Sequence, residues 1–207
     1  MAKEGAQAAS FLFVGNYTCI DFVNSSIMSD GQSVDLLPSF DHLAQWVMEA
    51  ELFEPRAGAA ARERWRDTDA SKSILIQAKE LRSAITLAVG RLGAGKGPGR
   101  NAVRLANGLL RQQTGYSEIV LAKGKYDRRF HSLLAEPVHL ILPIAESFAD
   151  LLCYADPSLI KKCERPACLL YFYDSTRNHA RRWCQMSTCG NRAKAAAHYR
   201  RRREAGS

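Results

Sequence analysis

The chain has 207 residues, of which 46% are hydrophobic, and a formal net charge of +8 at neutral pH. This length accommodates one folded body with a small appendage and is short for two full enzyme domains. No apolar run approaches the roughly 20 residues that a membrane-spanning helix needs, and residues 1–10 lack the order of a secretory signal. We therefore expect a cytoplasmic protein without a membrane partner, in which cysteines stay reduced.

The first 156 residues predict a mainly helical body. Residues 11–23 are rich in aromatic and β-branched side chains around Gly15 and Asn16, a dipeptide typical of turns, so we expect a strand, a turn and a buried strand. Apolar residues at helical spacing predict the helices of this body. These helices are expected at 39–53, 57–65, 71–92, 101–113 and 137–154.

A glycine-rich loop and a hairpin lie between these helices. The loop, GAGKGPG at 93–99, lacks the G-x4-G-K-[ST] pattern of a phosphate-binding loop, and no predicted strand precedes it. Residues 117–122 and 126–131 flank a Lys-Gly-Lys turn and predict a β-hairpin. The predicted fold class is therefore α+β: a mainly helical body with a small β-sheet, followed by a distinct C-terminal segment.

Positive charge is concentrated in that C-terminal segment. From Cys163 onward the chain has ten basic and three acidic residues, whereas residues 1–162 have 19 basic and 18 acidic residues. Localised positive charge indicates a polyanionic partner such as nucleic acid, and the alternative is a solubilising tail.

Four cysteines in the same segment have the spacing of metal ligands. They form two C-x4-C pairs, and the predicted ligands are Cys163, Cys168, Cys184 and Cys189. Two thiolates from each of two tight turns complete a tetrahedral zinc site, so we predict one bound Zn²⁺. Because no position remains for water, the ion should be structural. His179 and His198 are alternative ligands that a complete cysteine set does not need.

The segment between the pairs and the segment after them predict further elements. Residues 169–173 are typical of a strand, and a return at 181–183 would bring the two pairs together. From residue 191 the sequence favours a basic helix, with its small alanines packed on the finger or the body. Arginine and lysine neutralise phosphates. The predicted nucleic-acid-binding residues are Arg192, Lys194, Arg200, Arg201, Arg202 and Arg203.

Two motifs resemble known families. The string CGNR at 189–192, preceded by Cys184 and followed by AKAAAHYRRRR, resembles the CGNR zinc finger, a bacterial module that is zinc-ribbon-like or treble-clef-like. The string FVGNYTCIDFVNS at 13–25 is similar to the opening motif of the ABATE domain, with Ile20 and Ser25 where that motif has Leu and Thr. The resemblance implies an ABATE-like body over 1–156 and a CGNR-type finger with a basic helix over 157–207. It also implies a regulator of transcription.

The Asp and Asn that recur in the first motif are here Asp21 and Asn24. They could line a pocket for a small-molecule effector. The alternative, which we favour, is that they cap neighbouring backbone groups.

We expect a zinc-containing regulator that binds DNA in preference to RNA, with a body that senses an effector or forms a homodimer. The alternatives are an RNA- or ribosome-associated factor and a zinc-stabilised protein-interaction module. No His-Asp-Ser, paired-carboxylate or cofactor-loop pattern is apparent, so we expect no enzymatic activity.

Overall fold

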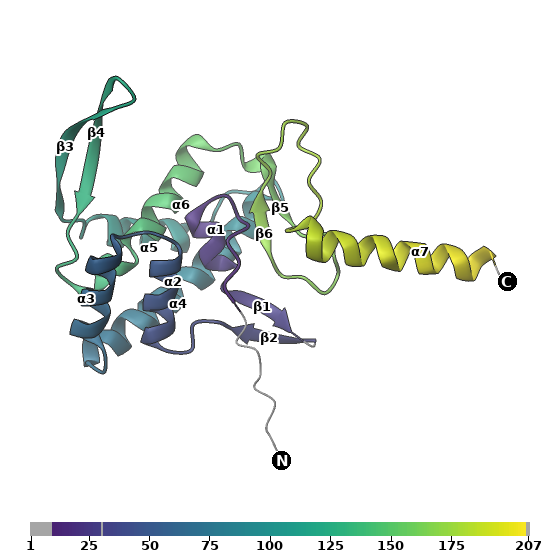
Figure 1. Cartoon of the computed structure of the whole chain (residues 1–207), viewed down its shortest axis with the longest axis horizontal. Coiled ribbons are helices and arrows are strands. Elements are labelled where there is room, and N and C mark those ends of the chain that lie inside the picture. The colour runs from purple at the N-terminus through teal and green to yellow at the C-terminus, as the bar shows by residue number, and fades with distance from the viewer. Residues whose placement is uncertain (1–9, 30, 206–207) are drawn as a thin grey trace, which may run out of the picture.

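The computed structural model describes residues 10–29 and 31–205, which form a helical body, a projecting hairpin and a finger that ends in a long helix (Figure 1). The helices are α1 Thr18–Val23, α2 Phe40–Glu49, α3 Pro55–Trp65, α4 Asp69–Leu92, α5 Arg100–Leu110, α6 Leu142–Tyr154 and α7 Asn191–Ala205. Three antiparallel strand pairs accompany them: β1 Ser26–Ser29 with β2 Gln32–Asp35, β3 Gly115–Ala122 with β4 Lys125–Ser132, and β5 Ile160–Lys162 with β6 Tyr171–Tyr173. The predicted α+β class, helical body and small antiparallel sheets are confirmed.

Helix α4 is the central element of the body. It contacts α1, α2 and α5, and its buried side chains recur at helical spacing, as in Ala78, Leu81 and Ile85. Its first turn is capped by Thr68, whose hydroxyl accepts a hydrogen bond of 3.1 Å from the Ser71 amide. Each large apolar side chain that becomes fully buried contributes roughly 1.5–3 kcal/mol, so this stripe is a main source of stability.

The prediction of two strands over 11–23 is wrong. Residues 18–23 form α1, whose Cys19, Ile20, Phe22 and Val23 are buried. A short apolar run fits a buried strand and a buried helix equally well, and only its neighbours decide between them. Here the run lies against α4 and α6, so helix packing accommodates its apolar side chains.

The other predicted body elements are present with shifted ends. The helix expected over 39–53 ends at Glu49, and Glu51 adopts a left-handed backbone with φ of 55°. The helix expected over 137–154 is a 3₁₀ turn, Pro137–Leu140, followed by α6. The glycine-rich segment 93–99 connects α4 to α5 and follows no strand.

The hairpin β3–β4 projects from the body (Figure 1). Its side chains are mostly exposed, including Ile119, Leu121 and Tyr126. Within the described ranges, no helix combines the length and apolar character needed to cross a membrane.

Candidate metal centre and nucleic-acid interface

The first cysteine pair lies in the turn of a short hairpin. Strand β5 pairs with β6 in a register that sets Ile160 opposite Tyr173 and Lys162 opposite Tyr171. The chain between the strands carries Cys163 and Cys168, and the Cys163 amide donates a hydrogen bond of 2.9 Å to the Leu170 carbonyl. The first pair is thus held in a knuckle closed by strand hydrogen bonds.

The strand expected over 169–173 is present in part, but its expected partner is wrong. Residues 181–183 form no strand, because β5 pairs with one edge of β6, and Asn24 and Gly15 form hydrogen bonds with its other edge. The returning chain instead reaches the knuckle through one backbone hydrogen bond of 3.0 Å, from the Glu164 amide to the Arg182 carbonyl. That contact lies beside both cysteine pairs.

The second pair lies where the finger becomes a helix. Cys184 precedes a π-helical turn, Met186–Gly190, which contains Cys189 and runs directly into α7. Two ligands therefore come from a hairpin turn and two from the start of a helix. This is the treble-clef-like arrangement.

The four sulfurs are placed as a tetrahedral zinc ion requires. All four Sγ atoms lie within 4.8 Å of one another, and those of Cys168 and Cys184 are 3.9 Å apart. Zn–S bonds of about 2.3 Å in a tetrahedron place sulfurs about 3.8 Å apart. His179 and His198 lie outside this cluster. The four cysteines fit one structural zinc site.

The electrostatics of the cluster also favour a bound cation. The hydrogen bond with Cys184 lowers the pKa of the Cys168 thiol to about 5 and raises the pKa of Cys184. Burial raises the pKa of Cys163. Thiols this close cannot all ionise unaided, whereas a divalent ion stabilises four thiolates together. The Arg165 side chain, with Nη1 3.9 Å from the Cys189 sulfur, offsets part of the remaining negative charge.

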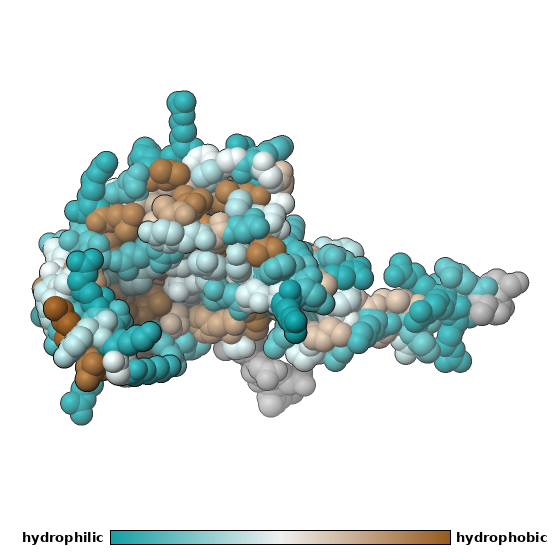
Figure 2. All heavy atoms as spheres, turned by 90° about the horizontal axis from the view of Figure 1, so that it is seen from above, coloured by the Kyte–Doolittle hydropathy of each residue, from teal (hydrophilic) through white to brown (hydrophobic). Residues whose placement is uncertain are grey.

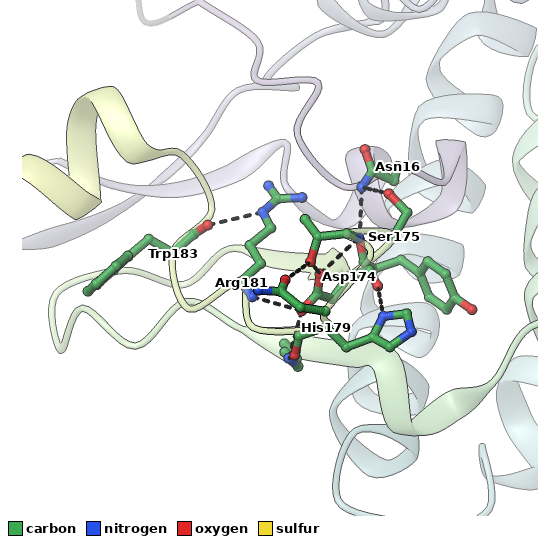
Figure 3. Close-up of polar contacts among 10 residues, drawn as sticks. Asn16, Asp174, Ser175, His179, Arg181 and Trp183 are labelled. Carbon is green, nitrogen blue, oxygen red and sulfur yellow. Dashed lines mark hydrogen bonds and ion pairs between the residues drawn. The ribbon is translucent and has the colours of Figure 1, made fainter.

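A buried carboxylate organises the loop between the pairs (Figure 3). Asp174 is fully buried and accepts hydrogen bonds from Lys161 Nζ at 2.7 Å, the Arg181 amide at 2.9 Å and the Thr176 hydroxyl at 2.6 Å. Burial alone would raise the pKa of Asp174, but these donors hold it well below its usual range. The local sequence signal for this role is the Asp-Ser-Thr run at 174–176, which is typical of a turn.

Arg181 joins this loop to the N-terminal segment of the body. Its Nη2 donates to the carbonyl of Val14 at 2.8 Å and also to that of Cys184. Its Nε donates to the carbonyl of Trp183 at 3.1 Å (Figure 3). The guanidinium carbon lies 4.1 Å from the centroid of the Phe172 ring. Sequence reasoning missed this role, because nothing local distinguishes Arg181 from the arginines around it.

Asp21 and Asn24 of the first motif both form hydrogen bonds with backbone groups. The Asn24 amide exchanges two hydrogen bonds of 2.9 Å with the backbone of Tyr171 in β6. Asp21 Oδ1 accepts a hydrogen bond of 2.7 Å from the Gly15 amide, and burial raises the pKa of Asp21 to about 6. These contacts match the capping interpretation, and an effector at these two residues stays a prediction.

Helix α7 carries the predicted basic residues into solvent. It extends away from the rest of the molecule, and Figure 2 shows hydrophilic side chains along most of it. Its 15 residues give it a length of about 22 Å at 1.5 Å per residue. The six predicted nucleic-acid residues are all exposed: Arg192, Lys194, Arg200, Arg201, Arg202 and Arg203.

The expectation that the alanines of this helix pack on the protein is wrong for Ala195 and Ala196, which are exposed. Ala193 and Ala197 are half-buried. The reason is that α7 meets the finger only near its start and then projects from it (Figure 1).

A groove of about 760 Å³ lies between α7 and the first knuckle. Its lining includes Arg165, Arg182 and Trp183 from the finger, together with basic residues from α7, namely Arg192, Lys194 and Arg200. The acidic residue in this lining, Glu164, forms an ion pair of 2.6 Å with Arg182. The Arg182 guanidinium carbon lies 5.0 Å from the Trp183 ring centroid. Arg165, Arg182 and Trp183 are not among the residues predicted from the sequence to bind nucleic acid. Their positions beside the cysteine ligands are a signal that could have identified them.

A helical body that carries a four-cysteine finger and an exposed basic helix is consistent with a zinc-containing regulatory protein. Comparison with family models agrees with this class. The CGNR zinc finger model matches residues 160–202, and the ABATE model, described as "Putative stress-induced transcription regulator", matches residues 16–155. Because the second match covers more than half of the chain, the protein belongs to the ABATE family. A comparison with curated proteins found no match.

Both resemblances seen in the sequence are thus confirmed, in the same order along the chain. The boundary predicted after residue 156 falls between the two matched ranges. The two parts are nevertheless in close contact, since Ile160 of β5 belongs to the apolar core of the body. Leu12, Val14 and Ile27 pack in turn against the buried cluster of the finger.

Proposed function

We propose that this protein regulates transcription in the cytoplasm by binding DNA through its zinc finger and α7. The observation that carries the proposal is the juxtaposition of the cation-lined groove with a basic helix that leaves the body. The zinc site fixes the direction of this helix, because Cys189 lies two residues before its first residue. The role requires no catalytic activity.

The shape of α7 suits duplex DNA. An α-helix with its side chains is about 10–12 Å across, and the major groove is about 12 Å wide. The Arg200–Arg203 run presents guanidinium groups around the helix and would contact phosphates irrespective of sequence. Arg192 and Lys194 are held near the finger, where a defined position allows contact with base edges.

A second candidate, an RNA-associated role, is favoured by Trp183. Its half-buried ring lies in the groove beside Arg182, and aromatic rings next to arginine stack with unpaired bases. Single-stranded RNA exposes such bases, whereas duplex DNA does not.

Fluorescence anisotropy with a random-sequence DNA duplex and a single-stranded RNA, each titrated at several salt concentrations, tests these proposals. If four to six cations meet phosphates, log affinity for the duplex should fall against log salt with a slope of about −4 to −5. Tighter binding of RNA, lost in Trp183→Ala, would select the second candidate. An affinity that is independent of salt would select a protein-interaction module.

The matched control is Cys189→Ser, which removes a zinc ligand and keeps every arginine. We expect this variant to lose selectivity among probes. If it binds all probes as tightly and as selectively as the native protein, the folded finger plays no part and α7 acts as a simple polycation.

A further inference from the structure

A second cavity, of about 540 Å³, lies where α4 and β1 meet the finger. Its polar lining includes Arg82, Ser83 and Thr86 of α4 and Lys162 of β5, while Leu169 and Tyr171 contribute apolar surface. The volume falls in the range of about 300–1,000 Å³ that is typical of small-molecule sites. Both parts of the chain therefore contribute to one open, concave surface.

Arg82 is the most informative residue of this cavity. It is only 9% exposed, and Nη1 donates hydrogen bonds of 2.8 Å to both Ser25 Oγ and Asp35 Oδ1. The Arg82 side chain also lines the cavity, so its guanidinium can offer further donors to a ligand acceptor there.

The charge of the cavity selects an anion. Arg82 and Lys162 line it, and none of its lining residues is acidic. Asp35 offsets Arg82 only in part, because its Oδ2 also forms an ion pair of 3.0 Å with Lys79. Arg82, Lys79 and Lys162 thus outnumber the single carboxylate beside them.

The apolar part of the lining selects an organic anion. Leu169 and Tyr171 face the cavity together with Val23, and the Lys162 ammonium lies 5.9 Å from the centre of the Tyr171 ring. We infer that this cavity binds a small organic carboxylate with an aromatic or aliphatic body, whose carboxylate contacts Arg82 and Lys162. Inorganic phosphate shares the anionic chemistry but lacks a body to cover the apolar surface.

Such a ligand would bridge the body and the finger. It would contact α4 on one side and β5–β6 on the other, next to the two hydrogen bonds by which Asn24 holds Tyr171. Binding should therefore reduce local opening of β5 and β6. This site does not overlap Asp21 or the groove beside α7, so the inference is independent of nucleic-acid binding.

Calorimetric titration of the zinc-loaded, full-length protein with benzoate, hexanoate, benzamide and phosphate tests the inference. Benzoate and hexanoate should bind, whereas neutral benzamide should bind at least about tenfold more weakly, since a hydrogen bond between charged groups is worth roughly that factor or more. Phosphate should also bind at least about tenfold more weakly, because it buries no apolar surface in the cavity. Bound benzoate should also slow amide hydrogen exchange in β5 and β6.

Three variants locate the site. Lys162→Met removes a lining cation, Lys72→Met removes an exposed cation of α4 outside the lining, and Ser83→Phe fills the cavity from an exposed position. We expect benzoate affinity to fall about tenfold in the first, to change less than about twofold in the second and to be lost in the third. Zinc content and circular dichroism would verify that each variant folds.

Several results would overturn the inference. These are equal losses in the two lysine variants, unchanged binding in Ser83→Phe, equal binding of benzamide and benzoate, binding of phosphate alone, or no binding of either carboxylate at millimolar concentration.

Discussion

Replacing Arg181 by methionine should loosen the finger although it removes no zinc ligand. The guanidinium donates to three backbone carbonyls, those of Val14, Trp183 and Cys184, and covers the Phe172 ring. Val14 belongs to the N-terminal segment of the body, and Cys184 begins the second ligand pair. Methionine retains the apolar stem and loses every donor, so the change isolates these polar contacts.

The magnitude follows from the number and kind of lost contacts. A hydrogen bond from a charged donor contributes roughly 1.5–3 kcal/mol, and contributions within one group are not additive. The partly buried carbonyls would also lose a donor that water replaces incompletely. We therefore expect Arg181→Met to lower the free energy of unfolding of the finger by about 3 kcal/mol.

Urea unfolding at a fixed free-zinc concentration, with zinc release to a chromogenic chelator measured in parallel, would test this value. Arg177→Met is the matched control, because Arg177 is an exposed arginine of the same loop. The control should unfold and release zinc as the native protein does. Equal stability and equal zinc release in the Arg181 and Arg177 variants would refute the reasoning.

Four further predictions concern the metal, a buried carboxylate, a glycine and the basic helix. Chelation of zinc should increase hydrogen exchange after Cys163 and leave most of the helical circular dichroism signal intact; complete unfolding would show that body and finger form one cooperative unit. Burial raises the pKa of Asp21 to about 6, so the stability that protonated Asp21 contributes is complete below about pH 4 and is lost as the pH rises through about 6. In urea unfolding, the free energy of unfolding of Asp21→Asn should therefore rise relative to that of the native protein by roughly 1 kcal/mol between about pH 5 and pH 7. A difference that stays constant with pH would contradict this. Gly15→Ala should lower the melting temperature, because a Cβ there would lie 2.9 Å from the Asp21 amide nitrogen, and an unchanged value would show that the turn relaxes. Alanine at all of Arg200–Arg203 should weaken binding to every DNA sequence alike, whereas Arg192→Ala should alter sequence preference. Competition among probes of different sequence measures both effects, and the opposite pattern would contradict the prediction.

The metal ligands and the long elements were predictable from local sequence. The two C-x4-C pairs identify the zinc ligands because tight turns set the ligand spacing, so no distant contact is needed to recognise them. Helix α4 and the hairpin β3–β4 were also predictable, since apolar periodicity and turn residues are local properties.

Only the tertiary structure decided the features that depend on distant partners. Residues 18–23 are helical because α4 and α6 lie against them, and β6 pairs with β5 because the knuckle turns the chain back at Cys163. The hydrogen bonds of Arg181 join segments far apart in the chain, and Arg82 and Lys162, also far apart in the chain, line one cavity. Periodicity and spacing report which side chains a segment buries, whereas the partner of a buried or charged group is set by packing between segments. The sequence by itself therefore determined which cysteines form the zinc site of the finger, and the fold determined how the finger is held to the body and where a cavity forms between them.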